Sequence, residues 1–225
     1  MDARRKVEHF LERPLRPARA GARRKGTLVI IGGHEDRSEE KRILRAVADR
    51  LGNDGKIVVC TAASAVPTDL WDEYDAAFRA LGVPHVFHLP IKSREDALST
   101  HAMRILEGAT GVFFTGGDQI KITSQIGDTP VYSRTLEIYE NGGVVAGTSA
   151  GASAMSETML VANDGDPSYR IKSALLMAPG LGFAHDMLID QHFTERGRMG
   201  RLIGAVSQNP RVLGLGIDEN TAIIV

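Results

Sequence analysis

The chain has 225 residues, of which 43% are hydrophobic and 24% are charged, and its formal net charge is −1 at pH 7. These values predict one domain with a substantial core, and they give no overall charge that would attract nucleic acid or a membrane surface. A single cysteine, Cys60, excludes a disulfide framework and a cysteine-based metal cluster, and no apolar stretch approaches the roughly 18 residues that span a bilayer. We therefore expect a cytoplasmic protein.

Residues 1–25 are rich in arginine and contain two prolines, which predicts a basic extension ahead of the domain. A solvated tail is one interpretation, and docking onto a partner subunit or an acidic polymer is the other. Asp2, Glu8 and Glu12 argue against an arginine-rich transit peptide.

From residue 26 onward, apolar strands alternate with amphipathic helices. The predicted strands cover 27–33, 56–63, 85–90, 111–117 and 142–151, and the predicted helices cover 38–52, 67–82, 94–108 and 129–140. Ser38 and Gly52 are the expected cap and stop of the first helix, and Pro67 the expected start of the second. The pattern predicts an α/β, doubly wound fold whose mainly parallel sheet has helices on both faces.

Three glycine turns follow predicted strands, over 31–37, 115–119 and 146–151. In doubly wound sheets, functional groups gather at these carboxyl ends of the strands. None of the three turns has the spacing of a P-loop or of a dinucleotide-binding loop, which argues against nucleotide binding.

The third turn, "GTSAGASAMS" (147–156), has the Gly-x-Ser-x-Gly spacing of a nucleophile turn. A short apolar strand precedes it and a helix-compatible, small-residue segment follows it. In that setting the Ser149 hydroxyl would project at the top of the sheet, near a helix N-terminus. The alternative is a tight turn that only needs small residues.

A nucleophilic serine needs a base and a third group that orients the base. Among seven histidines, His192 stands out because "DQHFTERGRMGR" (190–201) surrounds it with polar side chains. The acidic partner is sought at another strand end, where Asp218 and Glu219 occupy a corner between two apolar strands of 211–225. That corner would also serve as a plain turn.

Taken together, the motifs resemble the cyanophycinase family of serine peptidases. The resemblance covers essentially all of residues 26–225, which we expect to form the peptidase domain. It rests on the segments "GGHEDR" (32–37), "FFTGGDQ" (113–119), "GTSAGASAM" (147–155), "APGLGF" (178–183), "IDQHFTERGRMGR" (189–201) and "GIDENTA" (216–222). Aspartyl dipeptidases share the serine turn, whereas the blocks around His192 and Glu219 favour cyanophycinase.

The resemblance implies a class I glutamine amidotransferase-like fold and a Ser-His-Glu triad. Ser149 would be the nucleophile, His192 the general base and then acid, and Glu219 the residue that orients the imidazole. The backbone N–H of Ala150, with that of Gly117 or Asp118, would form the oxyanion hole.

The substrate implied by the family is cyanophycin, a poly-aspartate with arginine on each β-carboxyl, which is cut to β-Asp-Arg dipeptides. Three arginines are expected to bind substrate carboxylates, or else to form a solvated helix face with Glu195: Arg196, Arg198 and Arg201. The expected hydrogen-bonding groups are Gln119, Asp190 and Gln191, of which Asp190 is the alternative partner for the substrate guanidinium. The family also implies a homodimer without metal or cofactor.

Two departures from the family pattern stand out. His34 occupies a position in the first glycine turn where a small residue is expected, so the local pocket would differ. The chain also ends within an apolar strand at "TAIIV". From this we expect the last strands of the domain to be missing and the strand that holds Glu219 to lack a neighbour.

Two other functions remain open on the sequence. A related peptidase that cuts Asp-x or isoaspartyl dipeptides would take short aspartate-containing peptides instead of the polymer. A non-catalytic, amidotransferase-like binding module would show no dependence on Ser149.

Overall fold

A computed structural model of the chain describes residues 25–161 and 175–225, so the predicted basic extension lies almost wholly outside the described residues. A six-stranded sheet forms its centre, in the order β10-β1-β5-β4-β2-β3. The strands are β1 (Thr27–Ile31), β2 (Lys56–Cys60), β3 (His85–Leu89), β4 (Gly111–Phe114), β5 (Val144–Thr148) and β10 (Ala222–Ile224). Five of them are parallel, and β10 runs antiparallel to β1 at the edge.

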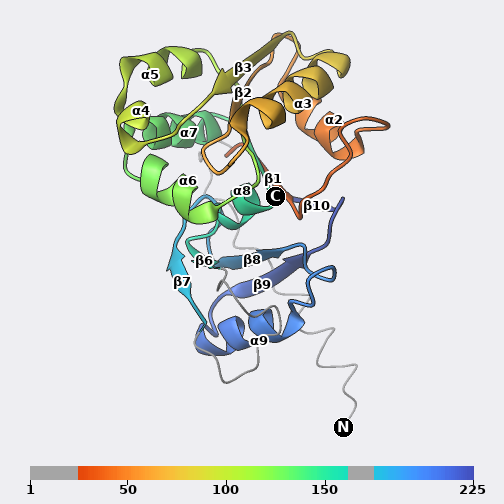
Figure 1. The fold of residues 1–225 in the computed structure, drawn as a ribbon, viewed down its shortest axis with the longest axis vertical. Helices are drawn as coiled ribbons and strands as arrows, with labels where there is room; N and C mark the ends of the chain where they lie inside the picture. The colour runs from red at the N-terminus through yellow and green to blue at the C-terminus, as the bar shows by residue number, and fades with distance from the viewer. Residues whose placement is uncertain (1–24, 162–174) are drawn as a thin grey trace, which may run out of the picture.

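Helices cover both faces of this sheet, which confirms the predicted doubly wound class (Figure 1). Alternating strand residues reach opposite faces: Val29 and Ile31 pack with α2 (Arg42–Ala48) and α3 (Pro67–Ala80). Leu28 and Ile30 belong to the core on the other face. That face is covered by α4 (Arg94–Leu98), α5 (Thr100–Leu106), α6 (Gln119–Ile126), α7 (Pro130–Glu140) and α8 (Ala150–Ser153).

A smaller layer lies beside this sheet, at the bottom of Figure 1. It comprises β6 (Thr158–Leu160) paired with β7 (Met177–Pro179), β8 (Met187–Gln191) paired with β9 (Leu213–Ile217), and α9 (Met199–Gln208). Leu188 packs against Leu202 and Ala205 of α9. The corner between β9 and β10 joins this layer to the large sheet, and Glu219 lies in that corner.

The bounds of two predicted helices were wrong. The first helix does not begin at Ser38, because the Asp36 carboxylate accepts the N–H groups of Ser38, Glu39 and Lys41 and holds that segment as a turn. The helix predicted over 94–108 is broken at Ser99, which caps the second half by accepting the Ala102 N–H. The pattern also missed α6.

The prediction that the strand beside Glu219 lacks a neighbour was wrong as well. β10 pairs with β1 through Val29, Ile30 and Ile31, and β9 pairs with β8. Each strand that flanks the corner therefore has a hydrogen-bonded partner.

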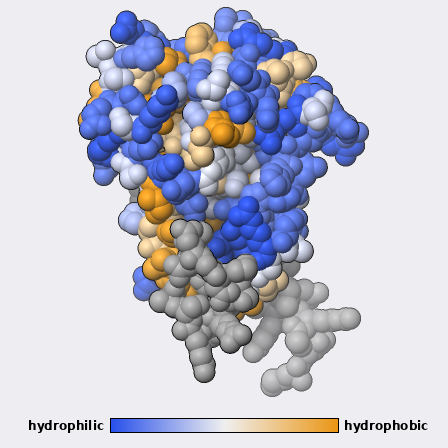
Figure 2. Space-filling model, in the orientation of Figure 1, coloured by the Kyte–Doolittle hydropathy of each residue, from blue (hydrophilic) through white to orange (hydrophobic). Residues whose placement is uncertain are grey.

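Hydrophilic residues cover most of the face turned to the viewer in Figure 2. Within the two described ranges, no helix has the length and apolar character needed to cross a membrane.

Candidate active site

The serine turn connects β5 directly to α8. Ser149 lies between them with φ 53° and ψ −111°, a conformation that costs a non-glycine residue about 1–3 kcal/mol. Its N–H donates to the Ile31 carbonyl at 3.0 Å, which ties the turn to the end of β1. A Cβ on Gly147 would come within 2.6 Å of the Gly151 backbone, and one on Gly151 within 2.3 Å of the Phe114 carbonyl. Close packing therefore requires glycine at 147 and 151, and Ser149 between them has a strained backbone at the top of the sheet.

His192 is the base within reach of this serine. Its Nε2 lies 2.8 Å from the Ser149 Oγ, and the residue is only 3% exposed. The backbone around it is held by its own N–H, which donates to the Gly32 carbonyl at 2.9 Å. Gly33 adjoins the ring so closely that an added Cβ would lie 2.3 Å from the His192 Cε1. The first glycine turn thus makes room for the imidazole.

Glu219 completes the arrangement from the corner between β9 and β10. Its Oε1 lies 2.6 Å from His192 Nδ1, and its Oε2 lies 2.9 Å from His34 Nδ1. Hydrogen bonds to His34 and His192 hold the pKa of the Glu219 carboxyl below its usual value. His34, which the sequence marked only as a departure from the family, is thus a second imidazole on the same carboxylate.

These three residues are also of the types that bind metal ions. Ligand atoms of His34, His192 and Glu219 lie within 4.8 Å of one another. Both nitrogens of His192 are, however, already engaged, one by Ser149 and the other by Glu219. The hydrogen bonds match a serine triad rather than a metal centre.

A cavity of about 430 Å³ opens beside the Ser149 hydroxyl, within the size range of small-molecule sites. Of the residues proposed from sequence, its lining includes Gly117, Gln119, Gln191, Arg196 and Arg198, besides Ser149 and His192. It also includes Glu35 and Tyr74, which sequence reasoning missed. The only signal for Glu35 was its place in the first glycine turn.

The two candidates for the second N–H of the oxyanion hole, Gly117 and Asp118, differ in whether that N–H is already hydrogen-bonded. The Asp118 N–H donates to the Ala63 carbonyl at 3.0 Å, and the Asp118 carboxylate caps α6 by accepting the Ile120 N–H. The Asp118 N–H is therefore already engaged in this structure, which favours the other alternative. Gly117 has φ +139°, and a Cβ there would lie 2.0 Å from the Ala63 oxygen. That leaves the Gly117 N–H, with the N–H of Ala150 at the first position of α8, as the donors to consider.

Among the polar residues proposed from sequence, two glutamines and two arginines adjoin the serine or the cavity. The Gln191 Oε1 lies 3.5 Å from the Ser149 Oγ. The Gln119 side-chain amide donates one N–H to the Leu160 carbonyl at 2.9 Å, and its second N–H and its carbonyl oxygen are the groups to consider for a ligand. Arg196 is exposed, and it lines the cavity.

Asp190, Arg198 and Arg201 form a buried cluster. The Arg201 Nε lies 2.6 Å from one Asp190 oxygen, and Arg198 lies 3.3 Å from the other. The exposed fractions are 0% for Asp190, 9% for Arg198 and 5% for Arg201. Both arginines contact Asp190, and Arg198 also lines the cavity, so their binding of substrate carboxylates stays a prediction. Their burial argues against a solvated helix face at Arg198 and Arg201.

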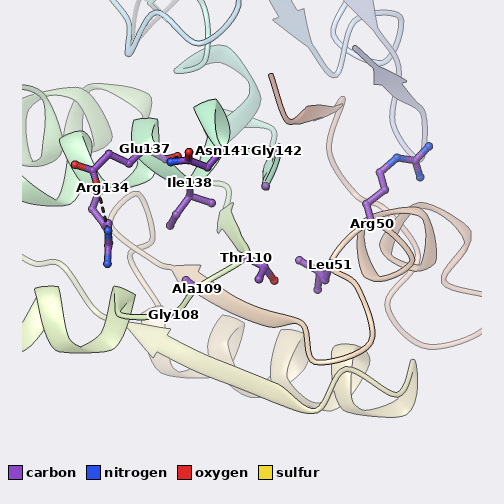
Figure 3. A pocket seen from close by; sticks show the side chains of 11 residues that line it. Arg50, Leu51, Gly108, Ala109, Thr110, Arg134, Glu137, Ile138, Asn141 and Gly142 are labelled. Carbon is purple, nitrogen blue, oxygen red and sulfur yellow. Dashed lines mark hydrogen bonds and ion pairs between the residues drawn. The ribbon is translucent and has the colours of Figure 1, made fainter. Parts of the chain in front are cut away.

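A second hollow, of about 380 Å³, lies at the opposite edge of the sheet, where residues 108–110 and 142–143 precede β4 and β5. Figure 3 shows Arg134 and Glu137 in this hollow, joined by an ion pair at 2.9 Å. Its eleven lining residues include no histidine, cysteine or serine. The hydroxyl of its one threonine, Thr110, accepts the Lys56 N–H. This hollow holds no nucleophile with a base.

The protonation of His192 sets the expected pH dependence of the reaction. Burial lowers the pKa of His192 below its ordinary value, and this outweighs the opposing hydrogen bond from Glu219. A general base must be neutral, so a lowered pKa keeps the base active at lower pH. We expect the acid limb of kcat/KM, measured against pH with a short peptide substrate, to have an apparent pKa below about 6.5. An apparent pKa above 7 would mean that Glu219 raises the pKa of His192 more than burial lowers it.

Comparison with known proteins agrees with this geometry. Residues 28–225 match the model of peptidase family S51. A cyanophycinase of Trichormus variabilis is 38% identical over 202 residues, covering 89% of this chain and 67% of that protein. A cyanophycinase of Synechococcus elongatus is 38% identical over 199 residues, covering 88% and 62%. The chain thus spans about two thirds of the length of these curated relatives.

Two solved structures share the fold. A peptidase from an acI-B1 Actinobacterium superposes with a TM-score of 0.65 at 22% identity, over 91% of this chain and 84% of that one. A putative peptidase E protein from Listeria monocytogenes gives a TM-score of 0.59 at 18% identity, over 90% and 95%. The family match spans the serine turn, His192 and Glu219, and the chain therefore belongs to peptidase family S51 and to the serine class of peptidases.

Proposed function

We propose that this protein is a cyanophycinase, which hydrolyses the poly-aspartate backbone of cyanophycin and releases β-Asp-Arg dipeptides. The observation that carries the proposal is the pair of hydrogen bonds from Ser149 to His192 at 2.8 Å and from His192 to Glu219 at 2.6 Å, beside a cavity of about 430 Å³. The substrate is suggested by relatives that are themselves named cyanophycinases.

In the first half of the proposed reaction, Ser149 Oγ attacks the carbonyl carbon of an α-peptide bond while His192 Nε2 takes the hydroxyl proton. Glu219 holds His192 Nδ1–H and stabilises the imidazolium that results. The oxyanion receives hydrogen bonds from the N–H groups of Ala150 and Gly117, and removing one such donor typically costs about 3–4 kcal/mol of transition-state stabilisation. His192 then gives its proton to the departing amine, and the carbon–nitrogen bond breaks.

In the second half, water attacks the acyl ester on Ser149 as His192 removes a proton from it. Collapse of this second intermediate breaks the ester bond, returns the proton to Ser149 Oγ and releases the dipeptide carboxylate. Every proton passes through His192, and the reaction requires water besides the chain and the substrate.

The charge distribution around the cavity supports an aspartate-rich substrate. Arg196 is the exposed one of the three arginines, and in the proposal it binds a substrate carboxylate. Arg198 and Arg201 are anchored by Asp190, and of the two Arg198 lines the cavity. A homodimer and a cytoplasmic location stay predictions.

The experiment is incubation of the full chain with cyanophycin granules, followed by mass spectrometry of the soluble products. We expect a product with the mass of β-Asp-Arg. Cleavage of short aspartyl or isoaspartyl peptides with the polymer left intact would instead identify a dipeptidase. A folded chain that cleaves neither substrate would favour the binding module.

A further inference from the structure

Glu35 is a buried carboxylate in the wall of the active-site cavity. It belongs to the loop that follows β1 and is 3% exposed, yet it lines the cavity together with Ser149. The triad does not use it. Burial of a carboxylate is unfavourable unless hydrogen bonds or an opposite charge compensate it.

Two neutral hydroxyl groups supply part of that compensation. The Thr148 Oγ1 donates to one Glu35 oxygen at 2.5 Å, and the Tyr74 hydroxyl donates to the other. Burial, with the adjacent Glu35 charge, raises the pKa of Tyr74 well above its usual value, so this hydroxyl remains a donor. A carboxylate has about four acceptor positions, and these two bonds leave others open.

The described residues supply no cation that forms an ion pair with Glu35. Arg37, two positions along the chain, pairs with Glu73 at 2.8 Å, and its guanidinium carbon lies 5.2 Å from the centre of the Tyr74 ring. Among the described residues, the buried Glu35 carboxylate beside the nucleophile therefore has hydroxyl partners and no ion-pair partner, and Arg37, which lines the same cavity, pairs with Glu73 instead.

The surroundings of Glu35 suit a cation on an aliphatic stem. Val66, Leu70 and the Tyr74 ring line the same cavity and offer apolar contacts for methylene groups. A planar guanidinium matches the open acceptor positions of a carboxylate better than an ammonium does. The cavity thus combines the exposed Arg196 for an anion with Glu35 for a cation.

We propose that Glu35 is the specificity-determining residue that binds the guanidinium of the arginyl side chain carried by the substrate's β-carboxyl. This assignment rests on the proposed function, because it identifies the partner of one group of that substrate. Thr148 and Tyr74 hold the carboxylate in place, and the arriving guanidinium supplies its counter-charge.

The test compares two synthetic β-aspartyl peptides that differ in one group, arginine in one and citrulline in the other. Citrulline has nearly the same shape but is neutral. The parent chain should cleave the arginine peptide with a kcat/KM roughly 30-fold or more above that of the citrulline peptide. In Glu35→Gln this preference should fall to about threefold or less, because the loss of kcat/KM is expected mainly on the arginine peptide. The matched control is Glu140→Gln, which changes the net charge equally on an exposed residue outside the cavity lining and should keep the preference.

Equal losses on both peptides in Glu35→Gln would overturn the assignment, because Glu35 would then only position the serine turn. A parent chain that cleaves both peptides equally well would also overturn it, even if Glu35→Gln failed to fold.

Failure of the proposed function is distinguishable from failure of this assignment, since the parent would then cleave neither peptide. In that case calorimetric titration with agmatine decides. Binding to the parent that is lost in Glu35→Gln and kept in Glu140→Gln would uphold the cation site. Absence of agmatine binding to the parent would overturn it.

Discussion

Replacing Ser149 with alanine is expected to reduce kcat for dipeptide release by roughly 10⁴- to 10⁶-fold. The hydroxyl is the group that forms the acyl bond, and in the structure it has the His192 Nε2 as its base at 2.8 Å. The oxyanion donors and the cavity remain in the variant, so a small residual rate above the uncatalysed reaction is expected. The measurement is dipeptide release followed by mass spectrometry, with circular dichroism to verify folding.

Ser153→Ala is the matched control for this loss. Ser153 is buried in the same short helix, its N–H donates to the Ser149 carbonyl, and it does not line the cavity. It should keep activity near that of the parent. A Ser149→Ala variant that retains a tenth or more of the parent activity would show that another group is the nucleophile.

Ser149→Gly separates the chemical role from the conformational one. Glycine adopts φ 53° freely, so this variant should lack activity like alanine but melt at a higher temperature than Ser149→Ala. The combination would show that the turn holds serine in a conformation that is unfavourable for stability. Equal melting temperatures would mean that the turn stores no strain.

The second large effect is expected on stability. Asp190→Asn should lower the free energy of unfolding by about 3–5 kcal/mol, because it removes the buried carboxylate that the guanidinium groups of both Arg198 and Arg201 contact. For a chain of this size, that corresponds to a decrease of roughly 10 °C in melting temperature. Activity should fall as well, since Asp190 directly precedes Gln191 and His192.

Two further variants test the reason for this decrease. Asp190→Asn combined with Arg201→Met restores the original net charge of the cluster and should recover part of the lost stability. Asp218→Asn makes the same chemical change on a carboxylate that accepts the Thr194 N–H near the surface, and its effect should be clearly smaller. If Asp190→Asn melts like the parent, the two arginines do not depend on Asp190.

Arg198 and Arg201 also show where sequence reasoning was insufficient. The sequence predicted contacts with substrate carboxylates or a solvated helix face, whereas both side chains contact Asp190. The sequence pattern did not reveal that the two arginine side chains point inward, toward Asp190. Their burial depends on how α9 packs against β8, and these two elements come together only on folding.

The sequence by itself determined the alternation of strands and helices, because near-continuous apolar strands and capped amphipathic helices carry their own periodicity. It also determined the location of the glycine turns, and its motif order indicated the family. These features are local, or depend on the order of segments along the chain.

Only the tertiary structure decided which polar groups meet. Ser149, His192 and Glu219 come from three separate segments, and their hydrogen bonds exist because β10 returns to pair with β1 and brings the β9–β10 corner beside the serine turn. The engagement of Asp118 with Ala63, the second imidazole on Glu219 and the buried Glu35 were likewise invisible in the sequence. Each depends on distances between residues far apart in the chain, and such distances are fixed by sheet pairing and core packing rather than by local pattern.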